Sequence, residues 1–262
     1  MKALIGYNGF VGSNLKKKIK FHKLYNSLNI KEIKNHFFAE VYCAAPHGIK
    51  FWANKNPKKD KKIILDLIES LKKVRCKRFI HISTLDVYPH NKKKLNESYN
   101  IFDSKTNSYG ENRKLIEKFI ISNFKNYLIL RLPALFGEGL KKNALFDLLN
   151  KKQIKTNPNS IFQWYNLEYL SKHINILKKN RIKVINLVSA PISFREIILF
   201  FKTKNIKILN NKNLKFNSGK LLNYNLYTKY SSLLRQKSNY IFSKQEILKQ
   251  LLAFIINYKK NV

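Results

Sequence analysis

Cysteine, proline, glycine and acidic residues are all scarce in this sequence of 262 residues. It contains two cysteines, six prolines, eight glycines and 15 acidic residues. Cys43 and Cys76 are too few for a disulfide framework, and Cys43 lies in an apolar segment, so we expect two reduced thiols and no metal site. No apolar run approaches the ~20 residues of a membrane span, and the N-terminus enters an apolar segment directly. The expectation is a cytoplasmic protein without a signal peptide or transmembrane segment.

The shortage of acidic residues leaves a formal net charge of +37. Such a charge attracts polyanions regardless of their sequence, which makes a polyanion-binding protein one alternative. Only seven of the 52 basic residues are arginines, however, and the lysines are spread over the whole chain with no nucleic-acid-binding motif beside them. An AT-rich genome gives this pattern to any protein. The favoured expectation is a solvated lysine surface, with no specific nucleic-acid partner and no membrane partner.

Three of the eight glycines occupy positions 6, 9 and 12, between a short apolar strand and the start of a helix. A glycine at 6 allows a tight turn, Gly9 allows the backbone to approach an anion closely, and Gly12 allows the helix to pack on the strand. The N–H groups of the helix N-terminus then face the anion. The order strand, glycine turn and helix therefore predicts a pyrophosphate-binding turn. Its residues are Gly6, Asn8, Gly9, Phe10, Val11 and Gly12.

Strand and helix patterns alternate through the first half of the chain, which predicts a parallel sheet with helices on both faces. Strands are expected at 3–6, 22–25, 39–44, 78–82 and 127–131, and helices at 58–74 and 108–124. Only about 14 residues separate the second strand from the third, so the sheet is expected to be abbreviated on that side. We expect a domain at 1–160 and a C-terminal region at 161–262. In that region a strand at 183–188 joins the sheet and the remainder partly binds substrate.

Two further segments carry side chains that suit acid/base chemistry. Thr84 follows the expected strand 78–82 at the carboxyl edge of the sheet, where open α/β sheets bind ligands. Tyr109 and Arg113 lie four residues apart on a helix and so share one face. A cation near the phenol favours phenolate, so we expect Arg113 to lower the pKa of Tyr109.

The three segments together, over roughly residues 1–140, resemble the extended short-chain dehydrogenase/reductases. They are G-x-x-G-x-x-G at 6–12, S-T-x-x-V-Y at 83–88 and Y-x-x-x-basic at 109–113. The resemblance implies an α/β protein with a Rossmann-type doubly wound parallel sheet and a small C-terminal substrate-binding region. It also implies hydride transfer with NAD(P), in which Thr84 hydrogen-bonds the reacting oxygen and Tyr109 moves its proton. The family has lysine where this chain has Arg113, and arginine holds its proton too firmly to relay it.

Departures from the family pattern narrow the expected reaction. The dehydratases of the family have two acids after the threonine, whereas this chain has Leu85 and Asp86. Epimerases commonly have asparagine where Ala134 lies, and the short gap after the second strand is similar to dTDP-4-dehydrorhamnose reductases. We therefore expect an oxidoreductase or epimerase that acts on a sugar nucleotide or a related carbonyl compound, with reduction favoured. The alternative is an NAD(P)-binding sensor or assembly protein whose catalysis is impaired.

The resemblance also assigns cofactor and substrate residues. Cofactor contacts are expected at Asn26, Ser27, Ala44, Ala45 and Pro133. NAD-specific domains usually have an acid after the second strand, and Asn26 and Ser27 take its place here, so NADP is preferred over NAD. Candidate substrate residues are Asp86, Lys141, Lys142 and Asn143. In the family the helix that carries the tyrosine often forms dimer contacts, so a homodimer is among the expected assemblies.

Overall fold

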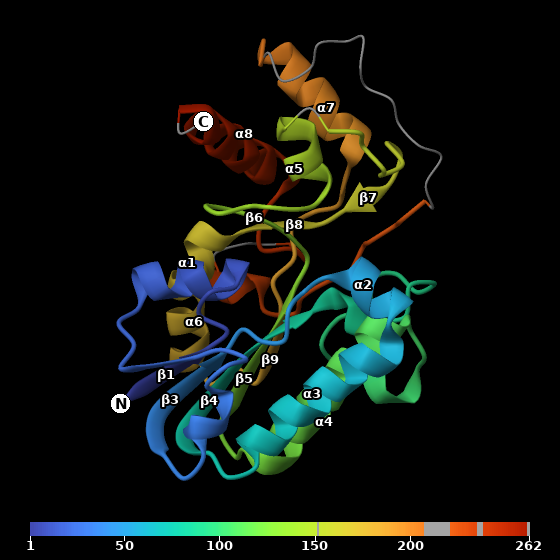
Figure 1. Cartoon of the computed structure of the whole chain (residues 1–262). Coiled ribbons are helices and arrows are strands. Elements are labelled where there is room, and N and C mark those ends of the chain that lie inside the picture. The colour runs from blue at the N-terminus through green and yellow to red at the C-terminus, as the bar shows by residue number, and fades with distance from the viewer. Residues whose placement is uncertain (151, 207–220, 235–237, 261–262) are drawn as a thin grey trace. The chain divides into compact units, whose positions relative to one another are not determined.

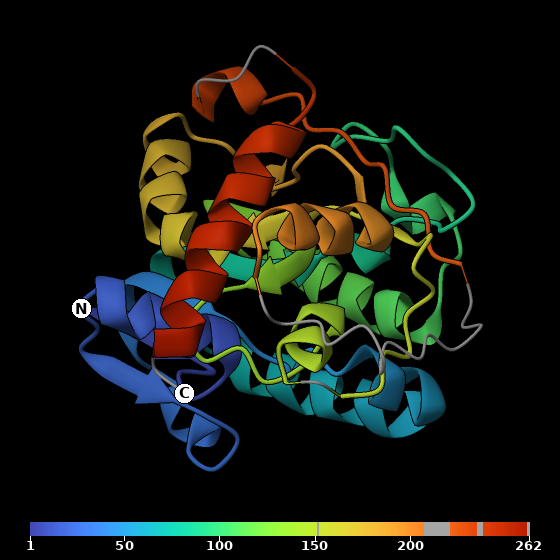
Figure 2. The same ribbon diagram turned by 90° about the horizontal axis from the view of Figure 1, so that it is seen from above.

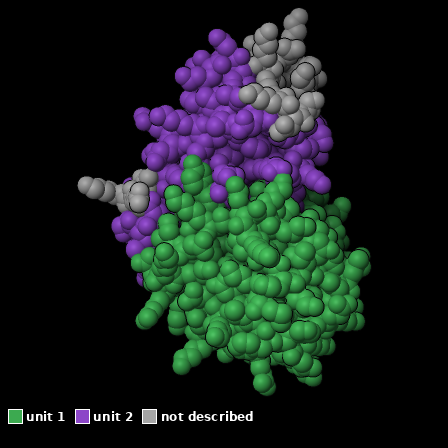
Figure 3. All heavy atoms as spheres, turned by 90° about the vertical axis from the view of Figure 1, so that its left-hand side faces the viewer, with its two compact units in different colours: residues 1–132, 169–186 green, residues 133–168, 187–262 purple. Residues whose placement is uncertain are grey.

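The computed structural model describes residues 1–150, 152–206, 221–234 and 238–260. They divide into two compact units, shown in green and purple in Figure 3. Unit 1 comprises residues 1–132 and 169–186, and unit 2 comprises residues 133–168 and 187–262. This division follows contacts within the fold, and the proposed domain boundary at residue 160 stays a prediction.

A six-stranded parallel sheet forms the centre of unit 1, in the order β2-β1-β3-β4-β5-β9 (Figure 1). Its strands are β1 (Lys2–Ile5), β2 (Lys23–Tyr25), β3 (Phe37–Cys43), β4 (Arg75–Thr84), β5 (Tyr127–Leu132) and β9 (Val184–Asn186). The strands are added in both directions from β1, with β2 on one side and β3, β4, β5 and β9 in turn on the other. Among the described residues no strand pairs with the outer side of β2, so β2 is an edge strand. The expected doubly wound α/β sheet is therefore confirmed, as are its short side at β2 and its last strand near 183–188.

Helices cover both faces of this sheet. On one face α3 (Pro57–Leu71) and α4 (Ser108–Asn123) lie side by side, as Figures 1 and 2 show. Apolar residues at helical spacing on both helices pack against alternate residues of the strands in one core. The helices α1 (Phe10–Lys18) and α6 (Leu170–Lys179) contact each other, and Lys178 of α6 reaches Glu40 of β3 at 2.7 Å. The short helix α2 (Lys50–Lys55) precedes α3.

The described residues of unit 2 form two small sheets and three α-helices. One sheet pairs β6 (Ala134–Phe136) with β8 (Trp164–Asn166), and the other pairs β7 (Ile161–Phe162) with β10 (Ile192–Ser193). The helices are α5 (Ala144–Leu149), α7 (Phe194–Thr203) and α8 (Lys244–Lys260). Ser193 and Glu196 form a capping box at the start of α7. No described helix has an apolar stretch long enough to cross a membrane.

Candidate active site

The glycine turn between β1 and α1 has the geometry that the sequence predicts. Gly6 has φ +80°, and a Cβ there would lie 2.9 Å from the carbonyl oxygen of Ala44. A Cβ on Gly12 would lie 2.0 Å from the carbonyl oxygen of Gly6. Both positions therefore require glycine, the first for its backbone conformation and the second for the contact between helix and turn.

The N-terminus of α1 is suited to an anion. Gly9 is the N-cap and offers no side-chain cap, the first turn has no acidic residue, and basic residues occupy the last turn. Ser13 is the first helical residue whose N–H returns to the cap carbonyl, at 2.8 Å. The preceding N–H groups of Phe10, Val11 and Gly12 have no partner inside the helix, as at any helix start. Together with the cradle that Gly6 and Gly12 keep open, they fit a pyrophosphate.

The end of β2 lies next to this turn, because Gly6 donates its N–H to the carbonyl of Tyr25 at 2.7 Å. Asn26 donates its side-chain amide to the Tyr7 hydroxyl at 3.2 Å, and its own side-chain oxygen accepts the N–H of Leu28. The Lys16 ammonium lies 5.6 Å from the centre of the Tyr7 ring. A cation from α1 and an amide from the residue after β2 thus both contact the Tyr7 side chain, and Ser27, the next residue, is exposed.

Thr84 and Tyr109 come together at the carboxyl end of β4. Thr84 caps the 3₁₀ turn Leu85–Val87, since its hydroxyl accepts the N–H of Asp86 at 3.2 Å. Tyr109 is at the start of α4 with 8% of its surface exposed, and its hydroxyl is near enough to Thr84 for that side chain to act on its pKa. Its backbone N–H donates to the Asn54 side chain at 2.8 Å. The structure therefore brings the two predicted reacting side chains into contact.

Burial raises the pKa of Tyr109, so the expectation that Arg113 would lower it overall is wrong. Desolvation of the phenolate is the largest effect, and the charge of Asp86 adds to it. The charge of Arg113 and the hydrogen bonds from Arg113 and Thr84 act in the opposite direction but do not prevail. Tyr109 is therefore a phenol at neutral pH in this structure, ready to donate a proton.

Arg113 shares the face of Tyr109, as its spacing predicts, but Asp60 holds its guanidinium. The guanidinium carbon lies 4.3 Å from the centre of the Tyr109 ring. Two nitrogens donate to the two Asp60 oxygens at 2.8 and 3.1 Å, and one also donates to the His47 carbonyl at 3.1 Å. Asp60 is fully buried. The next residue, Lys114, donates instead to Ser104 and Glu111 and so does not replace Arg113.

Gly110 sets how closely α4 approaches the turn after β4. A Cβ at this position would lie 1.9 Å from the carbonyl oxygen of Asp86. Thr106 strengthens the same contact, because its hydroxyl donates to the carbonyl oxygens of Asp86 and Tyr88 at 3.1 and 3.0 Å. The close approach holds Tyr109 against Thr84. Sequence reasoning assigned no role to Gly110, although a glycine inside a helix is a signal of close packing.

Lys50 and His90 are further site residues that sequence reasoning missed. The Lys50 ammonium lies 2.5 Å from Asp86 Oδ1, and His90 Nε2 lies 3.5 Å from the same oxygen. Asp86 Oδ2 accepts a hydrogen bond from the Thr84 hydroxyl at 3.4 Å. Asp86 therefore links Thr84 to a lysine 36 residues earlier in the chain. No local motif marks Lys50, since only the fold brings α2 to this turn.

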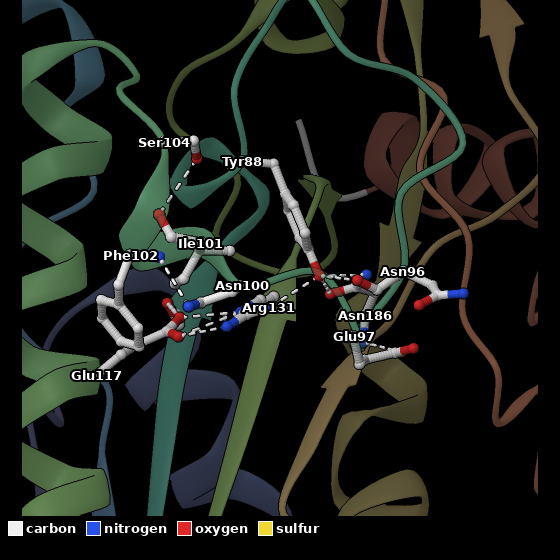
Figure 4. A network of polar contacts seen from close by, with 11 residues as sticks. Tyr88, Asn96, Glu97, Asn100, Ile101, Phe102, Ser104, Glu117, Arg131 and Asn186 are labelled. Carbon is white, nitrogen blue, oxygen red and sulfur yellow. Dashed lines mark hydrogen bonds and ion pairs between the residues drawn. The ribbon is translucent and has the colours of Figure 1, made fainter.

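A second buried polar network links α4 to the ends of neighbouring strands (Figure 4). Glu117 of α4 accepts three hydrogen bonds from Arg131 of β5, at 2.7 to 3.2 Å, and one from Ser83 at 2.5 Å. Arg131 also donates to the Tyr88 hydroxyl at 2.7 Å, and Tyr88 bonds Asn186 of β9. The network thus fixes the ends of β4, β5 and β9 relative to α4.

Four predicted residues belong to unit 2: Pro133, Lys141, Lys142 and Asn143. Pro133 opens it, and Lys141 and Lys142 are exposed. Asn143 caps α5: its oxygen accepts the N–H of Phe146 at 3.0 Å and its amide donates to the Leu135 carbonyl at 2.8 Å. These contacts give Asn143 a local structural role, and substrate binding by 141–143 stays a prediction.

The sheet and the glycine turn define a Rossmann-type α/β protein, with Thr84 and Tyr109 at the carboxyl end of its strand β4. The model of the NAD dependent epimerase/dehydratase family matches residues 24–156, just over half of the chain. The chain belongs to this family, which confirms the resemblance to the extended short-chain dehydrogenase/reductases. A search of curated protein sequences finds no match.

Solved structures of several sugar-nucleotide enzymes share this fold. UDP-glucose 4-epimerase from Thermotoga maritima, solved with UDP-glucose, is 16% identical with a TM-score of 0.76, covering 100% of this chain and 99% of that one. A dTDP-4-dehydrorhamnose reductase from Clostridium acetobutylicum is 18% identical with a TM-score of 0.73, covering 99% and 100%. A mutant UDP-glucuronic acid 4-epimerase from Bacillus cereus, solved with NAD and a fluorinated UDP-sugar, is 15% identical with a TM-score of 0.74, covering 100% of both chains.

Proposed function

We propose that this protein is an NAD(P)-dependent oxidoreductase or epimerase of sugar nucleotides, and that reduction of a carbonyl group is its main reaction. The contact between Thr84 and Tyr109 at the carboxyl edge of the sheet, in the unit that also carries the glycine cradle, is the observation that carries this proposal. The family membership and the UDP- and dTDP-sugar enzymes of the same fold support the substrate class.

The nucleotide cofactor would be held by the glycine turn, with its pyrophosphate at the N-terminus of α1 and its adenosine side near Asn26, Ser27, Ala44 and Ala45. When bound, it supplies or accepts a hydride. Thr84 orients the oxygen of the substrate, and Tyr109 moves the proton at that oxygen. Because the pKa of Tyr109 is raised, the phenol, which is the form that donates the proton in a reduction, predominates over the phenolate at neutral pH. This favours reduction of a carbonyl over oxidation of an alcohol, the first step of epimerisation.

NADP is the preferred cofactor in this proposal. The end of β2 has no acid to bind a ribose 2′-hydroxyl, and Lys16 lies at Tyr7, whose hydroxyl contacts Asn26. A 2′-phosphate would gain a cation here. Calorimetry should show tighter binding of NADPH than of NADH. Lys16→Met should weaken NADPH binding alone, and Lys20→Met, an exposed neighbour, should change neither affinity. Equal affinities for both cofactors would reject the preference.

The decisive experiment is a substrate screen with the purified protein. Reduction of dTDP-4-dehydrorhamnose is followed with NADPH and NADH, and epimerisation of UDP-glucose and UDP-glucuronic acid is followed with NAD. We expect turnover that falls by about 10²- to 10⁴-fold in Tyr109→Phe, which keeps the ring and removes the hydroxyl that donates the proton. Failure to bind any of these cofactors would overturn the proposal.

A cofactor-binding protein without catalysis is the second candidate, and the Arg113–Asp60 pair favours it. The guanidinium that replaces the lysine of the family is held by a buried carboxylate. Such a protein would bind the cofactor with an affinity independent of Tyr109 and would turn over no substrate in the screen. Turnover that depends on Tyr109 would exclude it.

A further inference from the structure

Reduction of a carbonyl consumes one proton in each turnover, and this proton must reach Tyr109 from water. This inference rests on the proposed function. Tyr109 is buried, and Arg113, the cation beside it, cannot supply the proton because a guanidinium does not deprotonate in proteins. The bonds from Arg113 to Asp60 and to the His47 carbonyl fix it further. Another group must therefore connect Tyr109 to solvent.

A continuous series of polar contacts leads from Tyr109 to the surface of unit 1. The Thr84 side chain acts on the Tyr109 hydroxyl, and the Thr84 hydroxyl donates to Asp86 Oδ2 at 3.4 Å. Asp86 Oδ1 accepts a hydrogen bond from Lys50 at 2.5 Å. Exposure increases along the series, since the side chain of Asp86 is 13% exposed and that of Lys50 is 34% exposed. The series therefore joins a buried phenol to an ammonium group that meets water.

We propose that Lys50, acting through Asp86 and Thr84, returns a proton from water to Tyr109 after each reduction. Lys50 would thus replace, from α2, the proton-relaying lysine that the Tyr109 helix lacks. An ammonium can release a proton and regain it from water, whereas the guanidinium of Arg113 cannot. The assignment gives Asp86 a defined part in the reaction, as the group that joins Lys50 to Thr84.

The protons balance along this route. As the carbonyl carbon receives the hydride, the Tyr109 O–H bond breaks and its proton forms the new alcohol O–H bond. The phenolate takes the hydroxyl proton of Thr84, and Thr84 takes the proton of the Asp86 carboxyl group. That carboxyl proton comes from the Lys50 ammonium at Oδ1 and reaches Thr84 after a half-turn of the carboxyl group. Neutral Lys50 then takes one proton from water, so one proton enters and one appears in the product.

The charged groups around the route determine which variants the test needs. Arg113 faces Tyr109 from α4 and is paired with Asp60 from α3. Asp86 faces Tyr109 from the turn after β4, and both Lys50 and His90 face Asp86. His90 is therefore the other group that could exchange protons with Asp86. A test must separate proton transfer by Lys50 from its charge and from His90.

Kinetics of dTDP-4-dehydrorhamnose reduction by NADPH provide this separation. Lys50→Arg keeps the positive charge but does not release a proton, and Lys50→Met removes both. We expect both variants to lower kcat at least about tenfold and to change KM less than about threefold. The solvent deuterium isotope effect on kcat should rise, because proton return becomes rate-limiting. Lys55→Met, the same change at an exposed position of α2, should keep kcat within about twofold.

Two results would overturn the proposal while leaving the proposed function intact. Unchanged kcat in Lys50→Arg would mean that Lys50 acts only through its charge. Loss of kcat in His90→Gln with full activity in Lys50→Met would mean that His90, and not Lys50, returns the proton through Asp86. No turnover by the unaltered protein with any substrate would instead overturn the proposed function, and the relay with it.

A titration without cofactor tests the same contacts independently of turnover. In protein labelled with ¹³C-tyrosine, the Tyr109 signal is assigned from its loss in Tyr109→Phe. Removing the Asp86 charge in Asp86→Asn should lower the pKa of Tyr109, and removing its partner in Lys50→Met should raise it further. Lys50→Arg should leave the pKa near that of the unaltered protein. An unchanged pKa of Tyr109 in both Asp86→Asn and Lys50→Met would overturn the series of contacts.

Discussion

Arg113 shows how one substitution in a motif changes the part that a side chain plays. Its spacing from Tyr109 predicts a cation at the phenol, and the cation is there, stacked on the ring. The motif does not reveal that Asp60, from α3, holds the guanidinium through two hydrogen bonds. An ammonium has no planar pair of donors to match this carboxylate. Arg113 is therefore a bridge between α3 and α4 as well as a neighbour of Tyr109.

Arg113→Lys is consequently expected to destabilise the protein although it restores the residue typical of the family. Loss of one charged hydrogen bond inside the buried pair should lower the free energy of unfolding by about 1–3 kcal/mol. Urea denaturation of the two proteins measures this difference. Arg75→Lys, the same change at an exposed position of β4, should stay within about 0.5 kcal/mol. Equal stability of Arg113→Lys and the unaltered protein would contradict the bridging role.

In the turn from β1 to α1, Gly9 and Gly12 have different roles, one in ligand binding and the other in packing. Gly12 is required by packing, because a Cβ there would collide with the Gly6 carbonyl. A Cβ on Gly9 would meet only the Gly6 carbonyl oxygen, at 3.3 Å, which a small shift accommodates. That methyl group would nevertheless stand at the N-cap of α1, where the pyrophosphate is proposed to bind.

The two glycines should therefore respond differently to substitution by alanine. Gly9→Ala is expected to weaken NADPH binding at least about tenfold while the melting temperature falls by no more than a few degrees. Gly12→Ala should lower the free energy of unfolding by about 1–3 kcal/mol, as overpacking does elsewhere. Calorimetric titration and thermal denaturation of both variants test this. If folded Gly9→Ala binds NADPH as tightly as the unaltered protein, the cofactor does not bind at this turn.

Local patterns predicted the elements better than their ends. The apolar periodicity indicated a helix at 58–74, whereas α3 runs over Pro57–Leu71. It begins at Pro57 because proline is favoured in the first turn of a helix. The strand expected at 78–82 is β4, Arg75–Thr84. Its first residues are mostly charged, so no apolar pattern marks them, and only pairing with β3 defines that end.

The same limit applies to the site. Thr84 and Tyr109 were predictable because each belongs to a short motif, and the sheet places such motifs at one edge. Lys50 and Asp60 lie outside those motifs, and their partners are 36 and 53 residues away along the chain. The raised pKa of Tyr109 also depends on burial by several elements, which a spacing of four residues cannot indicate.

At the scale of the whole molecule, the net charge of +37 makes a prediction that distinguishes a lysine surface from a nucleic-acid-binding site. Affinity for a random duplex DNA, measured by fluorescence anisotropy, should fall at least about tenfold between about 0.02 M and 0.15 M salt, because the attraction is purely electrostatic. RNA should behave in the same way. Sequence-dependent binding that survives about 0.15 M salt would favour the polyanion-binding alternative instead.

Stability of the whole molecule should also depend on pH through a histidine that the proposed reaction does not use. His81 is 1% exposed in β4, and burial lowers its pKa from 6.5 to about 4. Between these values the unfolded chain binds a proton that the folded chain does not, so stability rises with pH in this window and falls as pH decreases from about 6.5 to 4. The full loss from this group is about 3 kcal/mol.

Urea denaturation at pH 7.0 and pH 4.5 measures this contribution. Replacing His81 by leucine, a buried side chain that does not titrate, should reduce the loss of stability between the two pH values by about 2–3 kcal/mol. His173 of α6 is also buried with its pKa lowered to about 4, so the remaining pH dependence should persist until it too is replaced. If His81→Leu and the unaltered protein lose the same stability between pH 7.0 and 4.5, His81 does not stay neutral in the folded protein. In that case a negative charge in the core must balance the imidazolium of His81. Glu117 is the acid whose charge acts on this histidine.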